Sequence, residues 1–278
     1  MIKVIDVDKL FDEYISGYVY KNIGKVKPEE IENKIPQLYV EFGDKKLKEL
    51  DGKTPNTYYK SFSGEELLEC LKLHVTGGIP VSDFLCEALT LNPDYQDALI
   101  SALDDESSEE FTVYVMNIIK DNGANKVKGR YLKYILWDYS EIIRELATET
   151  LIDFADDVKE DILSQFKDAD ESKKIYLTEI LANTKMVAGD DRVFDILVAE
   201  FVKNQDAVPI YAGYLSKYGD DRAIPFLTAA IEREKISYAD FEELRFAIEA
   251  LGGEYNKTRD FSKDKSYKKI KATTKSEN

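Results

Sequence analysis

The tetrapeptide Gly-Asp-Asp-Arg occurs twice in the sequence, at residues 189–192 and again at residues 219–222. The two copies begin 30 residues apart, and an amphipathic helical pattern follows each of them. A supersecondary unit that recurs at such a period is typical of a solenoid, whose stacked units bury apolar faces that no unit can bury alone. The repeat therefore predicts the architecture. It does not predict the ligand, because individual side chains decide what a solenoid binds.

From residue 92 to residue 253 the sequence alternates between helical patterns and short turn signals. In the second helix of each predicted pair, apolar residues at i, i+4 and i+5 form one stripe to be buried. The pattern predicts five antiparallel helix pairs in an all-α chain, with helices at residues 94–103 and 108–121, 126–136 and 139–155, 158–167 and 171–186, 191–203 and 207–218, and 221–234 and 239–251.

Residues 215–227 read Leu-Ser-Lys-Tyr-Gly-Asp-Asp-Arg-Ala-Ile-Pro-Phe-Leu. This stretch resembles the pattern Leu-Gly-x-Ile-Gly-Asp-x-Arg-Ala-Ile-Pro-x-Leu of HEAT-like repeats, in the short subtype that is also found in phycobilisome lyases. Ile143, Arg144 and Ala147 are similar to the Val-Arg-x-x-Ala pattern of the same subtype. The resemblance covers about residues 92–254. It implies a right-handed α-α superhelix in which the second helix of each pair lines a concave face.

The two ends of the chain differ from this repeat region. Residues 1–91 contain irregular helical patterns, including a capping box in which Ser63 is followed three residues later by Glu66. We expect this region to form a helical N-terminal cap that covers the open apolar face of the first repeat. Residues 255–278 lose the apolar period and gain Lys, Ser and Thr, which predicts a basic, flexible tail.

Charge restricts the class of partner. The whole chain has a formal net charge of −16, but residues 255–278 contain eight Lys and Arg side chains against three Asp and Glu. The body without this tail is therefore at −21, which repels phosphate backbones and argues against nucleic-acid binding by the body. We expect a protein partner of basic or mixed charge. No membrane-spanning run and no secretory leader pattern is found, so a cytoplasmic protein that does not enter membranes is expected.

The residues that most often carry chemistry are scarce. His74 is the only histidine, and Cys70 and Cys86 are the only cysteines. These three side chains offer no histidine-rich metal centre, so we expect no metal, no organic cofactor and no catalytic residue. Cys70 and His74 lie four residues apart and can share a helix face, but a Cys-His pair without an orienting third group is more typical of structural residues than of a nucleophile.

Tyrosine is the residue type that points to binding, since 18 tyrosines occur in the 278 residues. Tyrosine supplies large amphipathic contact area and is enriched in interfaces. Tyrosines and arginines follow apolar residues at similar places in the second helices, and they either form a binding ladder or pack between repeats. The predicted partner-binding residues are Tyr114, Arg144, Tyr176, Tyr211, Tyr214 and Arg245.

Two functions fit these observations. The sequence favours a non-enzymatic protein-interaction scaffold or adaptor that binds through the concave face of the solenoid. The alternative is an enzyme or enzyme subunit, lyase-like, that acts on a small ligand in the same groove. Trp137, the only tryptophan, lies at a predicted helix junction, where a packed plug is more typical than a binding hot spot.

Overall fold

The computed structural model describes residues 2–105, 108–121, 125–265 and 267–269. Every regular element within these residues is a helix, which confirms the all-α prediction. The chain divides into two compact units, Met1–Val127 and Lys128–Asn278. None of the described helices has the length and apolar character that crossing a membrane requires.

The described residues of the first unit form eight α-helices. They are α1 (Val7–Asn22), α2 (Pro28–Glu32), α3 (Ile35–Gly43), α4 (Pro55–Tyr58), α5 (Gly64–Thr76), α6 (Asp83–Thr90), α7 (Gln96–Ala102) and α8 (Glu109–Asp121). Helix α5 packs against α6, α7 and α8, and α1 packs against α3. The predicted capping box is confirmed at the start of α5, where the Glu66 amide donates to Ser63 Oγ at 3.2 Å and the Ser63 amide donates to Glu66 Oε2 at 2.8 Å.

Eight further α-helices are found in the described part of the second unit. They are α9 (Lys128–Leu136), α10 (Glu141–Ile152), α11 (Ala155–Gln165), α12 (Glu171–Ala182), α13 (Arg192–Lys203), α14 (Val208–Tyr218), α15 (Ile224–Ile231) and α16 (Tyr238–Ala250). Short 3-10 helices occur at η1 (Lys48–Leu50), η2 (Tyr59–Ser61), η3 (Pro93–Tyr95), η4 (Asn125–Val127), η5 (Gln205–Ala207) and η6 (Asp221–Ala223).

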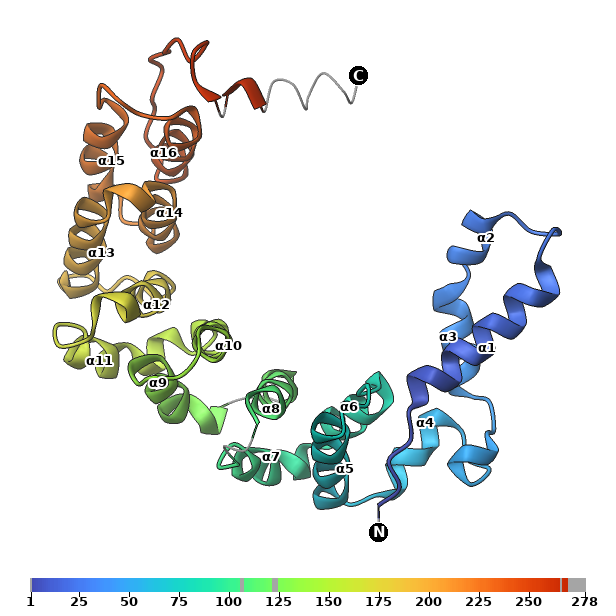
Figure 1. Cartoon of the computed structure of the whole chain (residues 1–278). Helices are drawn as coiled ribbons and strands as arrows, with labels where there is room; N and C mark the ends of the chain where they lie inside the picture. Colours follow the sequence, from blue (N-terminus) through green and yellow to red (C-terminus); the bar gives the residue numbers. More distant parts are fainter. Residues whose placement is uncertain (1, 106–107, 122–124, 266, 270–278) are drawn as a thin grey trace. The chain divides into compact units, whose positions relative to one another are not determined.

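Helices that follow one another pack as pairs, α7 with α8, α9 with α10, α11 with α12, α13 with α14 and α15 with α16. Within the second unit, the second helices also contact their neighbours in order, from α10 to α12, α14 and α16 (Figure 1). Their apolar stripes form the core between them, as the fully buried Ala147 and Leu151 of α10 and Leu177 and Leu181 of α12 show. This packing places the exposed faces of α10, α12 and α14 side by side.

The repeated tetrapeptide forms the same turn in both places. Gly189 and Gly219 have φ values of +81° and +84°, a left-handed conformation that glycine adopts without a steric penalty. The next residue, Asp190 or Asp220, accepts a hydrogen bond from the amide two residues later. The same carboxylate holds the arginine side chain of its own copy, with contacts as short as 2.7 Å at Arg192 and 2.6 Å at Arg222. The sequence repeat thus encodes a glycine turn and an arginine clamp.

These arginines also connect successive helix pairs. Arg222 Nη2 donates to Asp191 Oδ1 of the preceding copy at 2.7 Å. Arg192 reaches back in the same way, with both of its terminal nitrogens on the Glu160 carboxylate at 2.8 and 2.9 Å. Bidentate contacts of this kind are favoured by the planar guanidinium. The clamps fix the register of one pair on the next, and thereby the register of the second helices.

The segment after α16 returns to the last helix pair. Tyr255 and Phe261 pack against Phe241, with ring centroids 5.9 and 5.1 Å away. Lys257 also forms an ion pair with Glu232. The remainder of the predicted flexible tail, residues 270–278, lies outside the described residues.

Candidate functional site

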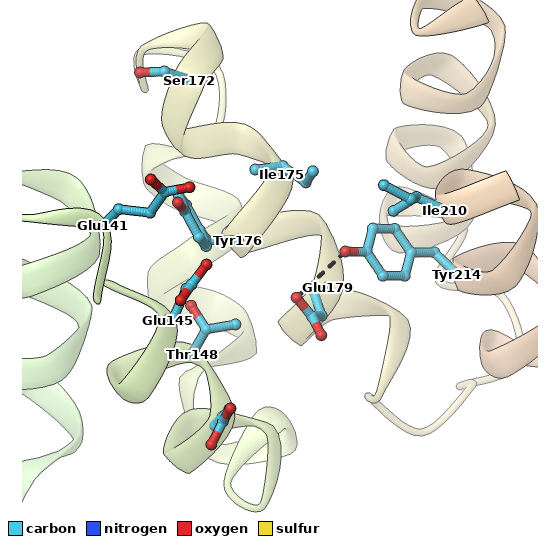
Figure 2. Close-up of a pocket in the computed structure, with 10 residues that line it drawn as sticks. Glu141, Glu145, Thr148, Ser172, Ile175, Tyr176, Glu179, Ile210 and Tyr214 are labelled. Carbon is cyan, nitrogen blue, oxygen red and sulfur yellow. Dashed lines mark hydrogen bonds between the residues drawn. The ribbon is translucent and has the colours of Figure 1, made fainter. Parts of the chain in front are cut away.

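The candidate site is a pocket of about 520 Å³ on the exposed faces of α10, α12 and α14 (Figure 2). Three consecutive second helices of the stack contribute to it. The lining residues are Glu141, Glu145, Thr148 and Glu149 from α10, Ser172, Ile175, Tyr176 and Glu179 from α12, and Ile210 and Tyr214 from α14. Four of these ten side chains are carboxylates and none is a lysine or an arginine, so we call this hollow the acidic pocket.

Helix α10 supplies an acidic wall. Glu141, Glu145 and Glu149 follow one another at intervals of four residues, so they share one face of the helix. Like charges at this spacing destabilise a helix by about 0.2–0.5 kcal/mol per pair. Within the described residues, Glu141 and Glu145 have no ion pair with a lysine or arginine that would offset this repulsion. Glu141 and Glu145 therefore carry negative charge that no basic side chain of the described residues offsets.

The opposite side of the pocket is apolar and aromatic. Figure 2 shows Glu141 and Glu145 on one side, and Ile210 and Tyr214 on the other. Ile210 is 46% exposed although it is a large apolar residue, and the half-buried Ile175 lies beside it in the lining. An exposed apolar side chain next to a hollow is typical of a binding surface when it joins a continuous patch. The pocket thus combines a charged wall with an apolar one.

Glu179 of α12 is hydrogen-bonded to Tyr214 of α14. Its Oε2 atom accepts a hydrogen bond from the Tyr214 hydroxyl at 3.3 Å, as the dashed line in Figure 2 marks. Burial raises the pKa of the Glu179 carboxyl above its usual value, the charges of Glu149 and Glu145 raise it further, and the hydrogen bond from Tyr214 opposes the rise. Burial and the nearby Glu179 likewise raise the pKa of Tyr214, so its hydroxyl remains a donor at neutral pH.

Tyr176 lies in the pocket lining, and the guanidinium of Arg144 lies over its ring. The Arg144 guanidinium carbon is 5.7 Å from the centroid of the Tyr176 ring, within the range of a cation–π interaction. Arg144 Nε is buried and has no hydrogen-bond partner within the described part of the chain. Arg144 itself is not among the residues that line the pocket, so its role is to hold the Tyr176 ring in place.

The six predicted binding residues are distributed unevenly. Tyr176 and Tyr214 line the acidic pocket, and Arg144 supports Tyr176. Tyr211 is only 5% exposed and packs edge-on against Tyr214, with 5.7 Å between the ring centroids. Arg245 lies on α16, outside the lining, and pairs with Glu242 at 2.6 Å. Tyr114 belongs to α8 of the first unit, so it is no part of this pocket.

The sequence prediction missed every lining residue except Tyr176 and Tyr214, and the four glutamates are the largest group among those missed. Glu141, Glu145 and Glu149 carry a signal in their spacing of four residues, which places them on one face of the predicted helix. Glu149 and Glu179 carry a second signal, because they are separated by one repeat period of 30 residues. Either pattern suffices to mark an acidic stripe. Neither one alone says that Tyr176 and Tyr214 lie beside it.

The two cysteines and the histidine all belong to the first unit, where Cys86 is only partly buried. Cys70 and His74 are both fully buried on α5, and His74 Nδ1 lies 2.7 Å from the Pro80 carbonyl oxygen. Burial raises the pKa of the Cys70 thiol to about 11, and that of Cys86 also to about 11. Both sulfurs are therefore protonated at neutral pH, whereas a nucleophilic cysteine reacts as the thiolate.

No set of three or more His, Cys, Asp or Glu side chains within the described residues has the geometry of a metal site. A scan against protein-family models, a search of curated proteins and a search of solved structures each found no match.

Proposed function

We propose that this protein is a non-enzymatic interaction scaffold that binds a basic segment of a partner protein in the acidic pocket of α10, α12 and α14. The observation that carries the proposal is the composition of the lining, with four glutamates and no basic side chain. Complementary charge speeds encounter and selects among partners. Tyr176 and Tyr214 add amphipathic rings of the kind enriched in interfaces.

The same proposal includes the architecture. We propose that the five helix pairs form a right-handed HEAT-like superhelix whose second helices line a concave, partner-binding face, in a protein of the cytoplasm. The ordered contacts from α10 to α12, α14 and α16 support this arrangement within the second unit. The two arginine clamps, Arg192 on Glu160 and Arg222 on Asp191, support a repeated register between pairs.

The test is affinity capture with the full chain from its native host, followed by binding measurements with each captured protein in purified form. Glu145→Gln and Tyr176→Ala should each lower the affinity for the partner at least tenfold. Glu243→Gln is the matched control, because it removes one charge from an exposed glutamate of α16 that does not line the pocket. If both pocket variants bind the partner as the wild type does, the scaffold function through this pocket is wrong.

A second candidate function follows from the size of the pocket. Its volume of about 520 Å³ lies within the range of small-molecule sites, roughly 300–1,000 Å³. A small cation such as a polyamine would fit the four carboxylates. Titration calorimetry with spermidine distinguishes the two candidates, because the scaffold proposal expects weak binding of the free polyamine compared with the protein partner.

A further inference from the structure

The acidic pocket has a charged wall and an apolar wall, so a complementary ligand has two chemically different sides. Glu141, Glu145 and Glu149 offer negative charge from α10, whereas Ile175 and Ile210 offer apolar surface from α12 and α14. A ligand with positive charge alone would leave the isoleucines in contact with polar groups or water. A ligand with apolar groups alone would remove the Glu141 and Glu145 carboxylates from water without a counter-charge, which is unfavourable.

The spacing of the carboxylates along α10 matches the side-chain spacing of an extended peptide. Four residues of an α-helix rise about 6 Å, so the glutamates of α10 form steps of that length. In an extended chain, side chains alternate between two sides, and residues on the same side are about 6.6 Å apart. Basic residues at every second position therefore keep in step with Glu141, Glu145 and Glu149, while the residues between them face the opposite wall.

The volume of the pocket supports an extended ligand over a helical one. One residue of extended chain occupies about 160 Å³, from a rise of about 3.3 Å and spacings of about 4.8 and 10 Å. The pocket volume of about 520 Å³ thus holds about three such residues. A five-residue helical segment with two basic residues four apart has the same 6 Å step, but its cylinder of about 10–12 Å diameter occupies roughly 590–850 Å³, more than the pocket volume.

We propose that the acidic pocket binds an extended peptide segment in which basic residues alternate with apolar ones, with a basic–apolar–basic core of three residues inside the pocket. The inference rests on the proposed function and adds a sequence rule for the partner. Lysine or arginine side chains lie on the Glu145 and Glu149 side, and the apolar residue between them lies on Ile175 and Ile210. Tyr214 lies beside Ile210 on this side of the pocket, with its hydroxyl toward Glu179.

The experiment measures fluorescence anisotropy of three labelled peptides with the full chain. The first is Gly-Lys-Ile-Lys-Ile-Lys-Gly, which alternates. The second, Gly-Lys-Lys-Lys-Ile-Ile-Gly, has the same composition in blocks. The third, Gly-Glu-Ile-Glu-Ile-Glu-Gly, reverses the charge. We expect the alternating peptide to bind at least tenfold more tightly than the blocked peptide, and the acidic peptide not to bind. Glu145→Gln should weaken the alternating peptide about tenfold, and Glu243→Gln should leave its affinity unchanged.

Equal affinity for the alternating and blocked peptides overturns the inference, because only net charge would then be recognised. An unchanged affinity of Glu145→Gln for the alternating peptide overturns it as well. Spermidine that binds more tightly than any peptide, with the same loss in Glu145→Gln, replaces it with a small-cation site. If the alternating peptide does not bind but Tyr176→Ala and Glu145→Gln still weaken a captured protein partner, the inference fails and the scaffold function stands.

Discussion

The hydroxyl of Tyr214 on α14 donates a hydrogen bond to the Glu179 carboxylate on α12, across 3.3 Å. This contact joins two second helices that belong to different pairs. It also holds one of the four pocket carboxylates in a half-buried position, where burial and the charges of Glu149 and Glu145 raise its pKa. The pKa of Glu179 can therefore be measured in solution to test whether this contact forms.

Tyr214→Phe removes the donor and should raise the pKa of Glu179 further, since the hydrogen bond stabilises the charged form. The measurement is a carbon-detected NMR titration of glutamate carboxyl groups. Tyr211→Phe is the control, because the Tyr211 hydroxyl makes no contact with Glu179 and should leave that pKa unchanged. A Glu179 pKa that stays the same in Tyr214→Phe would show that the hydrogen bond does not form.

The raised pKa of Glu179 sets the sign of a pH dependence. In the folded state the carboxyl binds its proton more tightly than in the unfolded state, where the ordinary value is 4.5. Its contribution to stability is therefore fully present below about pH 4.5 and is lost as the pH rises through the higher folded pKa. Glu179→Gln should increase the melting temperature at pH 7 and change it less at pH 4.

Glu160→Gln is the control with the opposite sign. The hydrogen bonds from Arg192 lower the pKa of Glu160, so its charge stabilises the fold above its usual pKa, and this stabilisation is lost as the pH falls. At pH 7, Glu160→Gln should lower the melting temperature, while Glu179→Gln raises it. Two shifts of the same sign would contradict the assignment of one of these carboxyl groups.

Glu145→Gln should stabilise the fold while it weakens binding. The substitution removes two like-charge contacts at a spacing of four residues, with Glu141 and with Glu149, worth roughly 0.4–1 kcal/mol together. Urea denaturation at low ionic strength measures the gain, which should shrink in 0.5 M salt because exposed charges are screened. A loss of stability would mean that Glu145 has a structural role.

Gly213 in the middle of α14 and Gly219 at its C-cap should respond to alanine in opposite directions. Gly213 lies within the helix with open space around it, so Gly213→Ala should stabilise the fold by up to about 1 kcal/mol. Gly219 has the same open space but a φ of +84°, so Gly219→Ala should cost about 1–2 kcal/mol through backbone strain. Thermal denaturation of both variants checks the turn that the repeated tetrapeptide forms.

Tyr176→Ala and Tyr211→Ala separate binding from packing. Tyr211 is 5% exposed, so its truncation should destabilise the fold by about 3–5 kcal/mol, as for other large core residues. Tyr176 lines the pocket, and its loss removes the interaction with Arg144, worth about 0.5–1 kcal/mol. Circular dichroism melts should show a large drop for Tyr211→Ala and a small one for Tyr176→Ala. A large drop for Tyr176→Ala would assign that ring to the core.

The helix pairs could be predicted closely because their period of 3.6 residues is a property of each segment alone. The predicted helices at 108–121, 191–203 and 207–218 differ by one residue from α8, α13 and α14. The largest shift is at the end predicted at residue 186, because the Asn183 and Thr184 side chains donate to backbone carbonyls and α12 ends at Ala182. At the predicted helix start of residue 221, Asp220 accepts from the Arg222 amide and a 3-10 turn intervenes, so α15 begins at Ile224.

The candidate site was only partly predictable. All but one of the predicted binding residues follow an apolar residue in a second helix, and this order does not determine which face of the helix a residue occupies. Ile143 and Leu244, which precede the two arginines, are 5% and 0% exposed, whereas Ile210, which precedes Tyr211, is 46% exposed. One residue corresponds to a rotation of about 100° around the helix axis, so such an offset moves a side chain off the shared face. Trp137 was also placed incorrectly. It was expected to pack as a plug at a helix junction, but this residue is 58% exposed.

The contact between Arg222 and Asp191 has a consequence for how this chain could change its length. The arginine of each copy reaches back to a carboxylate of the preceding helix pair, Glu160 for Arg192 and Asp191 for Arg222, so the first copy of Gly-Asp-Asp-Arg supplies both such an arginine and such an acceptor. A tandem duplication of the 30 residues between the copies would bring its own partners on both sides. The array can therefore grow by whole modules without any compensating substitution at the new junction.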